Sequence, residues 1–307
     1  MKKALVVIST LLLFSCGSKA LSYLNTAIDI MEENSIKKKE IDWKELRTSA
    51  LAEMKGKESI EETYPIIEKI LRELGDNHSF LLTEQLRTKM RQAHENLPIV
   101  EYKIINKQIA YLKIPAFMGS DSLPNNFAES IQKQIKKLDK KEIKSWIIDL
   151  TENTGGNMWP MYLGLSPILG DGISGYFLDS ENKFYEWRYS NNAVYEGKTK
   201  HLEIEDSYVL NNTDYDKIAV LIGRKTASSG EAIAIAFKEF PKTQFFGEFT
   251  HGLTTGNSIH PLSDGAKLIL TTSIFVDRTK TIYGGPIEPD IYTTKPEEKA
   301  VKWLMEK

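Results

Sequence analysis

One short stretch, residues 217–240, constrains the fold of this chain more than any other. It opens with the apolar, β-branched run IAVLI at residues 218–222, which is typical of a buried strand in a parallel sheet. A turn of small residues, TASSG at 226–230, leads into the run AIAIAF, which is apolar on every side and therefore predicts a buried helix. Strands and helices alternate along much of the chain, so we expect a mixed α/β (α+β) fold.

The turn in this stretch holds two candidate nucleophiles, Ser228 and Ser229. A sharp strand-to-helix turn exposes a hydroxyl group at a helix N-terminus, where free backbone N–H groups can receive an oxyanion. Thr226 stands where the G-x-S-x-G pattern has its first glycine, so the turn does not match that motif. This stretch alone leaves open that either serine is simply the helix N-cap.

A second strand and loop carry two adjacent glycines. The run WIIDL at residues 146–150 predicts a buried strand, and Gly155 and Gly156 lie in the loop beyond it. Glycines permit positive φ and close backbone approach, as an oxyanion or phosphate loop requires. A tight turn without a ligand is the alternative.

His78 is the histidine whose surroundings best suit a catalytic base. It lies in the polar loop DNHSF at residues 76–80, directly after a predicted helix end at Gly75. A single histidine is more often structural than catalytic, so this role needs support from other motifs.

The composition allows a large core and excludes one class of partner. The chain has 307 residues, of which 41% are hydrophobic, enough for one large or two modest domains. Its formal net charge of −2 leaves no chain-wide basic footprint for nucleic acid. Positive charge is local, at residues 37–39 and 133–144, and such runs are usually solvated helix faces.

The N-terminus predicts a secretory signal. A basic start precedes an apolar run at residues 4–14 that is too short to span a bilayer. Residues 13–16, LFSC, resemble the bacterial lipobox, in which the cysteine is lipidated and becomes the first mature residue. We therefore expect a signal peptide at residues 1–15 and a lipid anchor at Cys16, the only cysteine of the chain, with plain secretion as the alternative.

Periodicity divides the rest of the chain into two predicted domains. Residues 16–97 carry helical patterns, with Asp42 as an N-cap and an S-x-x-E capping box that starts at Ser59. Residues 98–307 begin with strands that alternate around residues 106–107 as a hairpin. The patterns further on predict a helix at 127–138, a strand-rich segment at 172–210, a glycine-threonine loop at 248–257, a strand from 267 and a charged C-terminal helix.

Four motifs lie in order along the chain: DNHS at 76–79, IDL-x-x-N-x-GG at 148–156, TASSGE at 226–231, and GE-x-T-x-G at 247–252 with EPD at 288–290. In this order they resemble motifs of the serine peptidases that include the tail-specific (C-terminal processing) proteases, the tricorn core and interphotoreceptor retinoid-binding protein. The resemblance implies a ClpP/crotonase-like β-β-α spiral core preceded by a small helical N-terminal domain.

Position by position, the resemblance implies Ser228 as the nucleophile and His78 as the general base. The backbone N–H groups of Ser229 and of Gly155 or Gly156 would form the oxyanion hole, which usually contributes most to such a site. No metal and no organic cofactor is required.

The chain departs from the family pattern around the base. Leu253 stands where tail-specific proteases have their catalytic lysine, which argues against a Ser/Lys dyad and favours His78. Asn77 stands where tricorn has the serine that helps to orient its histidine. The candidates for an orienting group are therefore Asn77, Glu231, Glu288 and Asp290, each of which could equally be structural. No PDZ-sized insertion separates the hairpin from the core.

These observations predict a lipid-anchored, extracytoplasmic serine peptidase of the bacterial envelope, in the periplasm or at the cell surface. It would cleave peptides or unfolded proteins through an acyl-enzyme. Its partners would be a peptide or protein substrate and, through Cys16, the membrane. Two alternatives stay open: a binding lipoprotein on the same fold, and hydrolysis of another acyl bond such as an ester.

Overall fold

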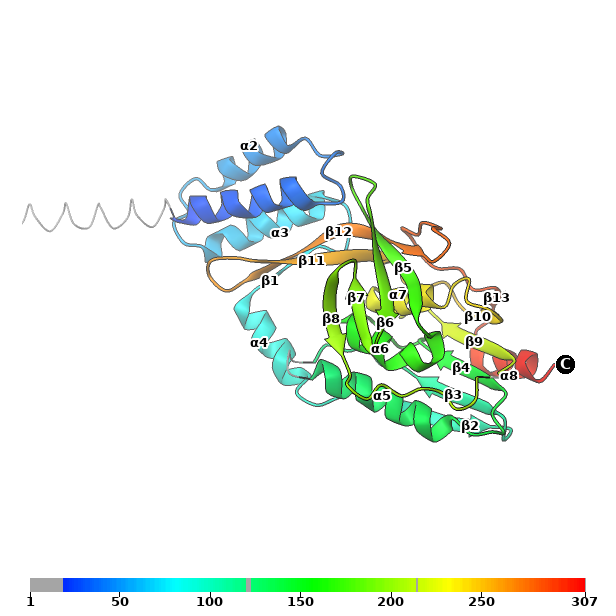
Figure 1. The fold of residues 1–307 in the computed structure, drawn as a ribbon. Helices are drawn as coiled ribbons and strands as arrows, with labels where there is room; N and C mark the ends of the chain where they lie inside the picture. The colour runs from blue at the N-terminus through cyan, green and yellow to red at the C-terminus, as the bar shows by residue number, and fades with distance from the viewer. Residues whose placement is uncertain (1–18, 120–122, 214, 307) are drawn as a thin grey trace, which may run out of the picture. The chain divides into compact units, whose positions relative to one another are not determined.

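The computed structural model describes residues 19–119, 123–213 and 215–306 (Figure 1). The chain divides into two compact units. The first, the helical unit, comprises the chain up to Lys89 with Asp179–Glu181 and Gly256–Ser273. The second, the core unit, comprises Met90–Leu178, Asn182–Thr255 and Ile274–Lys307. The predicted signal peptide and Cys16 lie outside the described residues, and the predicted domain boundary at residue 97 stays a prediction.

The helical unit packs amphipathic helices around an aliphatic core. Its helices are residues 19–34, α2 (Trp43–Glu53), the 3-10 helix η1 (Glu61–Thr63) and α3 (Tyr64–Glu73). Their buried faces contribute Leu24, Ile28, Leu46, Ile67 and Ile70 to one cluster. The predicted caps are confirmed. Asp42 Oδ1 accepts from the N–H of Glu45 at 3.0 Å, and the Glu62 carboxylate accepts from the N–H of Ser59 at 3.0 Å.

Short strands complete the helical unit and correct two predictions. They are β1 (Phe80–Leu82), β11 (Thr255–Pro261) and the first part of β12 (Lys267–Asp277), with α4 (Glu84–Ala93) following β1. β1 pairs with β12, with Leu81 opposite Leu268, inside the predicted helical domain of residues 16–97. β11 begins inside the loop predicted at 248–257 and continues through residues 258–261, for which no element was predicted. Both strands form by pairing with β12. β12 is distant from β1 in sequence, so the pairing gives β1 no periodic pattern that could predict it.

The core unit is built on a six-stranded sheet in the order β13-β10-β9-β4-β3-β2. The strands are β2 (Glu101–Ile105), β3 (Ile109–Lys113), β4 (Ser145–Asp149), β9 (Lys217–Ile222), β10 (Thr243–Gly247) and β13 (Ile291–Tyr292). Neighbours run parallel except in the β2–β3 hairpin. Asn106 and Lys107 have positive φ in the three-residue turn 106–108, which confirms the predicted hairpin.

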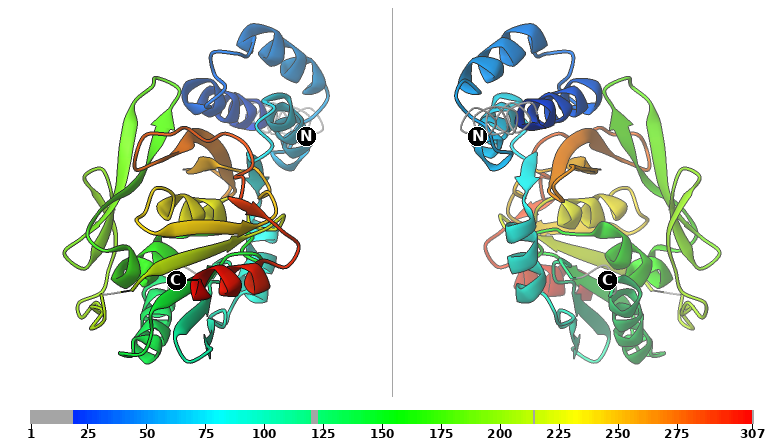
Figure 2. Two further views of the ribbon diagram at one scale, coloured as in Figure 1. Left: turned by 90° about the vertical axis from the view of Figure 1, so that its right-hand side faces the viewer. Right: turned by 90° about the vertical axis from the view of Figure 1, so that its left-hand side faces the viewer.

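Helices cover both faces of this sheet. They are α5 (Pro124–Leu138), α6 (Met158–Leu169), α7 (Ser229–Ala236) and α8 (Pro296–Met305). Successive strand residues point to opposite faces. Trp146 and Ile148 therefore join the cluster that includes α5, α6 and α7, whereas Ile147 packs with Ala300 and Leu304 of α8. Figure 2 shows the red α8 beside the sheet.

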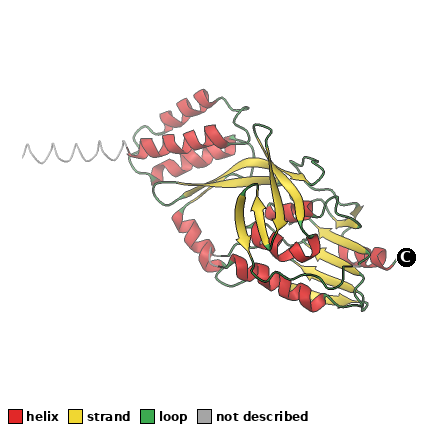
Figure 3. Cartoon of the chain, viewed as in Figure 1, coloured by secondary structure: helices red, strands yellow, loops and turns green. Residues whose placement is uncertain are grey.

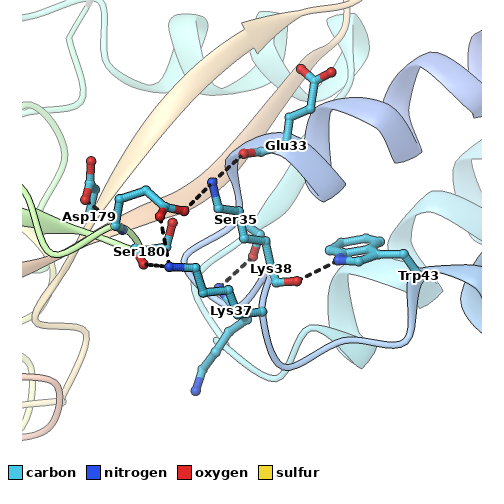
Figure 4. A network of polar contacts seen from close by, with 9 residues as sticks. Glu33, Ser35, Lys37, Lys38, Trp43, Asp179 and Ser180 are labelled. Carbon is cyan, nitrogen blue, oxygen red and sulfur yellow. Dashed lines mark hydrogen bonds and ion pairs between the residues drawn. The ribbon is translucent and has the colours of Figure 1, made fainter.

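The strand-rich segment predicted at 172–210 is present as an antiparallel run (Figure 3). Its strands are β5 (Gly172–Asp179), β6 (Phe184–Ser190), β7 (Ala193–Glu196) and β8 (Thr199–Glu203). The tip of the β5–β6 hairpin belongs to the helical unit. There Glu181 forms ion pairs with Lys38 and Lys39, at 3.1 and 2.9 Å, in the network of Figure 4.

The register of β4 and β9 determines where a site can form. Asp149, the last residue of β4, lies opposite Leu221 near the end of β9. Because the strands are parallel, the loops that follow them leave the same edge of the sheet. These loops, residues 150–157 and 223–228, carry the predicted glycines and serines.

Candidate active site

Ser228 occupies a strained position at the start of a buried helix. It is the N-cap residue of α7, with φ 51° and ψ −119°. Positive φ is uncommon for a residue with a Cβ and costs free energy unless the surroundings enforce it. The side chain is half-buried, whereas every residue of α7 is buried.

The turn before Ser228 is held by hydrogen bonds from both strand ends. Thr226 Oγ1 donates to the carbonyl of Leu150 at 2.8 Å and accepts from the N–H of Gly223 at 3.0 Å. The N–H of Ala227 donates to the carbonyl of Asn153 at 3.0 Å. The threonine that breaks the G-x-S-x-G pattern therefore ties the turn to the end of β4. These bonds hold the backbone of Ser228 in its strained conformation.

The glycines let the two loops approach more closely than side chains would permit. A Cβ on Gly155, which has φ 106°, would lie 2.9 Å from Cβ of Ser228. A Cβ on Gly156, with φ 103°, would lie 2.0 Å from the carbonyl oxygen of Phe117. A Cβ on Gly230 would lie 2.5 Å from the carbonyl oxygen of Asn153. The loop after β4 thus packs directly on Ser228.

The backbone N–H groups near Ser228 differ in whether they are free. The N–H of Gly155 donates to Oδ1 of Asn153 at 3.0 Å, so it is already engaged. Among the described residues, no hydrogen bond uses the N–H of Gly156 or of Ser229. The carbonyl of Gly155 accepts from the N–H of Phe117 at 3.1 Å. Since the N–H of Gly156 is trans to that carbonyl, it points away from Phe117. Of the two predicted glycines, Gly156 is therefore the better donor to an oxyanion.

The two adjacent serines have different surroundings. Ser229 is buried, and its Oγ donates to the carbonyl of Gly156 at 2.5 Å. This bond fixes the glycine loop against the first turn of α7. A hydroxyl used in this way is a poor nucleophile, so the geometry favours Ser228 for that role.

Glu231 joins the Ser228 turn to a second loop. Its carboxylate is fully buried and accepts from the N–H of Ser228 at 2.9 Å, from the N–H of Gly252 at 2.8 Å and from the hydroxyl of Thr250. Burial raises the pKa of the Glu231 carboxyl, and these hydrogen bonds oppose the rise. The contacts of Glu231 thus fix the backbone of Ser228, a role that the sequence did not predict.

Asn153 is a second organising residue whose role the sequence reasoning missed. It is fully buried, and its Nδ2 donates to the carbonyl of Ile114 at 3.1 Å. Its Oδ1 accepts from Gly155, as described above. An asparagine two residues before a glycine commonly forms such an Asx turn, which is the signal that could have revealed it.

His78 lies in a loop of the helical unit that is tightly held. Asp76 Oδ1 accepts from the N–H groups of His78 and Ser79, at 2.9 and 2.7 Å. The carbonyl of His78 accepts from Nδ2 of Asn257 at 3.1 Å. Asn77 is exposed and has φ 57°, so it forms the outer bend of this loop. His78 and Ser228 belong to different units, and their pairing stays a prediction.

The C-terminal loop of the core unit contains the last predicted residue, Glu288. Its side chain is exposed, and its carbonyl accepts from Nζ of Lys238 at 3.3 Å. Nearby, Oδ2 of Asp290 accepts from the N–H of Phe245 at 2.7 Å, which ties the loop to β10.

Two negative findings apply to the described residues, 19–119, 123–213 and 215–306. Within them, no group of three His, Cys, Asp or Glu side chains is placed to hold a metal ion. The same residues include no helix whose length and apolar character would let it cross a bilayer.

Known proteins resemble this chain in both sequence and fold. The nisin-resistance protein of Lactococcus lactis subsp. lactis is 31% identical over 283 residues, which cover 92% of this chain and 86% of that protein. The structure of a lipoprotein from Streptococcus agalactiae matches with a TM-score of 0.77 at 27% identity, over 93% of this chain and 96% of that one. The photosystem II D1 C-terminal processing protease shares the fold, with a TM-score of 0.61 at 15% identity over 90% and 93% of the two chains.

The family model for peptidase family S41 matches residues 108–293, which include the glycine loop, the Ser228 turn and the loop of Glu288. This match confirms the resemblance to the family and includes three of the four motifs, whereas DNHS at 76–79 lies outside it. The shared fold confirms the expected mixed fold of a helical N-terminal region with a sheet-based core. The chain belongs to peptidase family S41.

Proposed function

We propose that this chain is a serine peptidase that cleaves peptides or unfolded proteins outside the cytoplasm, held at the bacterial envelope by a lipid on Cys16. The observation that carries the proposal is the conformation of Ser228. A non-glycine residue with φ 51° begins a buried helix, and the Gly155–Gly156 loop packs against its Cβ. Strain of this kind is common at catalytic nucleophiles that sit on a strand-to-helix turn.

In this proposal Ser228 Oγ attacks the carbonyl carbon of the scissile amide while His78 accepts the serine proton. The N–H groups of Gly156 and Ser229 donate to the oxyanion that forms. When the C–N bond breaks, His78 returns the proton to the leaving amine and an acyl-enzyme remains. A water molecule, deprotonated by His78, then hydrolyses the ester and frees Ser228.

The buried carboxylate contributes without touching the substrate. Glu231 holds the N–H of Ser228 and the loop at Gly252, so we assign it to positioning the nucleophile. Asn77 and Glu288 stay the candidates for orienting His78. No residue of this scheme requires a metal ion or an organic cofactor.

The relatives support the substrate class and the location. One is a nisin-resistance protein, so nisin is the first substrate to test. Another is a lipoprotein, which agrees with the lipobox-like residues 13–16. Either the periplasm or the cell surface would suit such an enzyme.

A fluorophosphonate probe tests the proposed nucleophile directly, since it reacts with activated serines. We expect the wild type to be labelled and Ser228→Ala to be unlabelled. Ser229→Ala is the matched control. It keeps Ser228 and should still be labelled, more slowly because the glycine loop loses its bond to Ser229. His78→Ala should lose labelling because the base is gone.

Two other outcomes would replace the proposal. A well-folded wild type that is neither labelled nor active on peptides would favour the binding lipoprotein, for which Leu253 at the usual lysine position is the supporting observation. Labelling together with cleavage of esters, and of no peptide in a panel that includes nisin, would favour an esterase.

A further inference from the structure

The outer face of α5 and the turn after it form a dense cluster of positive charge. Residues 133–144 contain six lysines and two acidic residues. All six lysines are exposed: Lys133, Lys136, Lys137, Lys140, Lys141 and Lys144. We call these six residues the lysine face. The opposite face of α5 is buried in the core unit through Phe127, Ala128, Ile131, Ile135 and Leu138.

The lysines of the lysine face are not held in ion pairs. Among the ion pairs of the described residues, none includes a lysine of this face. Of the two acidic residues within 133–144, Asp139 accepts from the hydroxyl of Tyr208 at 2.7 Å and from the N–H of Asn211 at 2.6 Å. The other, Glu142, is exposed and forms none of these ion pairs. The other lysine run behaves differently, because Lys37 pairs with Glu40, and Lys38 and Lys39 pair with Glu181.

Exposed apolar groups lie beside the lysine face. Strand β2 is at the edge of the sheet and packs next to α5 (Figure 1). Tyr102 on β2 is 43% exposed and Ile104 is 38% exposed. Nζ of Lys137 lies 4.9 Å from the centroid of the Tyr102 ring and 3.3 Å from its hydroxyl oxygen. Unpaired lysines next to an exposed tyrosine and an aliphatic side chain suit the interface of a bilayer better than open solvent.

We propose that the lysine face docks the core unit on the anionic headgroups of a membrane. Clusters of four to eight lysines attract acidic lipids, and the attraction falls off within roughly 10 Å at ordinary salt. The formal charge of the whole chain is −2, so this attraction is local and favours one orientation of the core unit. The docking does not depend on the peptidase activity. The proposed lipid at Cys16 would keep the chain near such a surface but is not needed for the contact.

Vesicle binding by the full-length chain tests this docking. Vesicles of phosphatidylcholine are compared with vesicles that also contain phosphatidylglycerol. Changing all six lysines of the face to Gln should weaken the preference for acidic vesicles by at least about tenfold. The double variant Lys136→Gln/Lys140→Gln should weaken the preference several-fold. Because it changes only two side chains, it tests the docking even if the six-lysine variant does not fold. In the wild type the preference should disappear at high salt.

The matched control changes Lys37, Lys38 and Lys39 to Gln, an equal kind of substitution in lysines that already have partners. It should bind acidic vesicles as the wild type does. The N-terminal segment is present in every version, so its own affinity for lipid cancels in the comparison. Equal binding by the wild type, the double variant and the six-lysine variant would overturn the proposal. Equally tight binding of duplex DNA at the same salt would also overturn it, because the face would then be a general polyanion surface.

Discussion

Replacing the buried carboxylate Glu231 by Gln tests how the nucleophile turn is held. The carboxylate accepts from three donors, the N–H groups of Ser228 and Gly252 and the hydroxyl of Thr250. A glutamine has one acceptor oxygen, so its NH2 group must face at least one of these donors. The hydroxyl of Thr250 cannot easily turn away, because it also accepts from the N–H of Ile287 at 2.7 Å.

One buried donor left without an acceptor costs about 1–3 kcal/mol. We therefore expect Glu231→Gln to lower the free energy of unfolding by this amount in urea titrations. We also expect the strained backbone of Ser228 to relax, and a misplacement of about 1 Å can reduce rate on the order of 10²-fold. The rate of fluorophosphonate labelling under folded conditions measures that loss.

The control is the same chemical change at an exposed site of the core unit, Glu205→Gln, which should alter the free energy of unfolding by less than about 0.5 kcal/mol. If Glu231→Gln has the same free energy of unfolding and the same labelling rate as Glu205→Gln, the carboxylate does not hold the turn. Such a result would refute the reasoning.

The pH dependence of the same substitution has a defined sign. Burial raises the pKa of Glu231 in the folded protein above its ordinary 4.5. Between these two pKa values the folded chain binds more protons than the unfolded chain, so this group's contribution to stability falls as pH rises. Glu231→Gln lacks that dependence. The difference in unfolding free energy between wild type and variant should therefore be largest below pH 4.5 and shrink above it.

Three further predictions concern single sites. Gly155→Ala should lower the free energy of unfolding by about 1–3 kcal/mol and abolish labelling, because a φ of 106° and the 2.9 Å approach to Ser228 exclude a Cβ. Gly285→Ala is the control, because a Cβ there meets open space, and it should change neither quantity. Burial lowers the pKa of His260, so stability should fall as pH drops below 6.5, and His260→Leu should reduce this fall in urea titrations at several pH values. Asp42→Ala should cost about 0.5–2 kcal/mol in urea, because α2 loses its N-cap; no change would argue against that cap.

The sequence predicted correctly the helices, strands and turns that depend on residues close together in the chain. The β2–β3 hairpin follows from alternation around Asn106 and Lys107, and α2 follows from its cap at Asp42. The strand, turn and helix around Ser228 also formed as expected, because the run before the turn is β-branched and the run after it is rich in alanine.

The contacts that organise the site could not be predicted in the same way. The bonds of Glu231 to Thr250 and Gly252 join residues about twenty positions apart, and Asn153 acts across two loops. Such contacts depend on which strands are neighbours, and sequence periodicity does not specify strand order. β11 was missed because Thr, Gly, Asn and Ser give it no alternating pattern.

The two parallel strands that support the site also determine how the protein should lose activity. β4 is buried along its whole length, and β9 is buried at every residue except Lys217. Amides in such strands exchange with deuterium mainly when the whole unit unfolds. The two loops start at the ends of these strands and are bonded to each other through Thr226 and Ala227. They should therefore stay assembled on heating until the sheet itself melts, so that inactivation and loss of the sheet occur at one temperature.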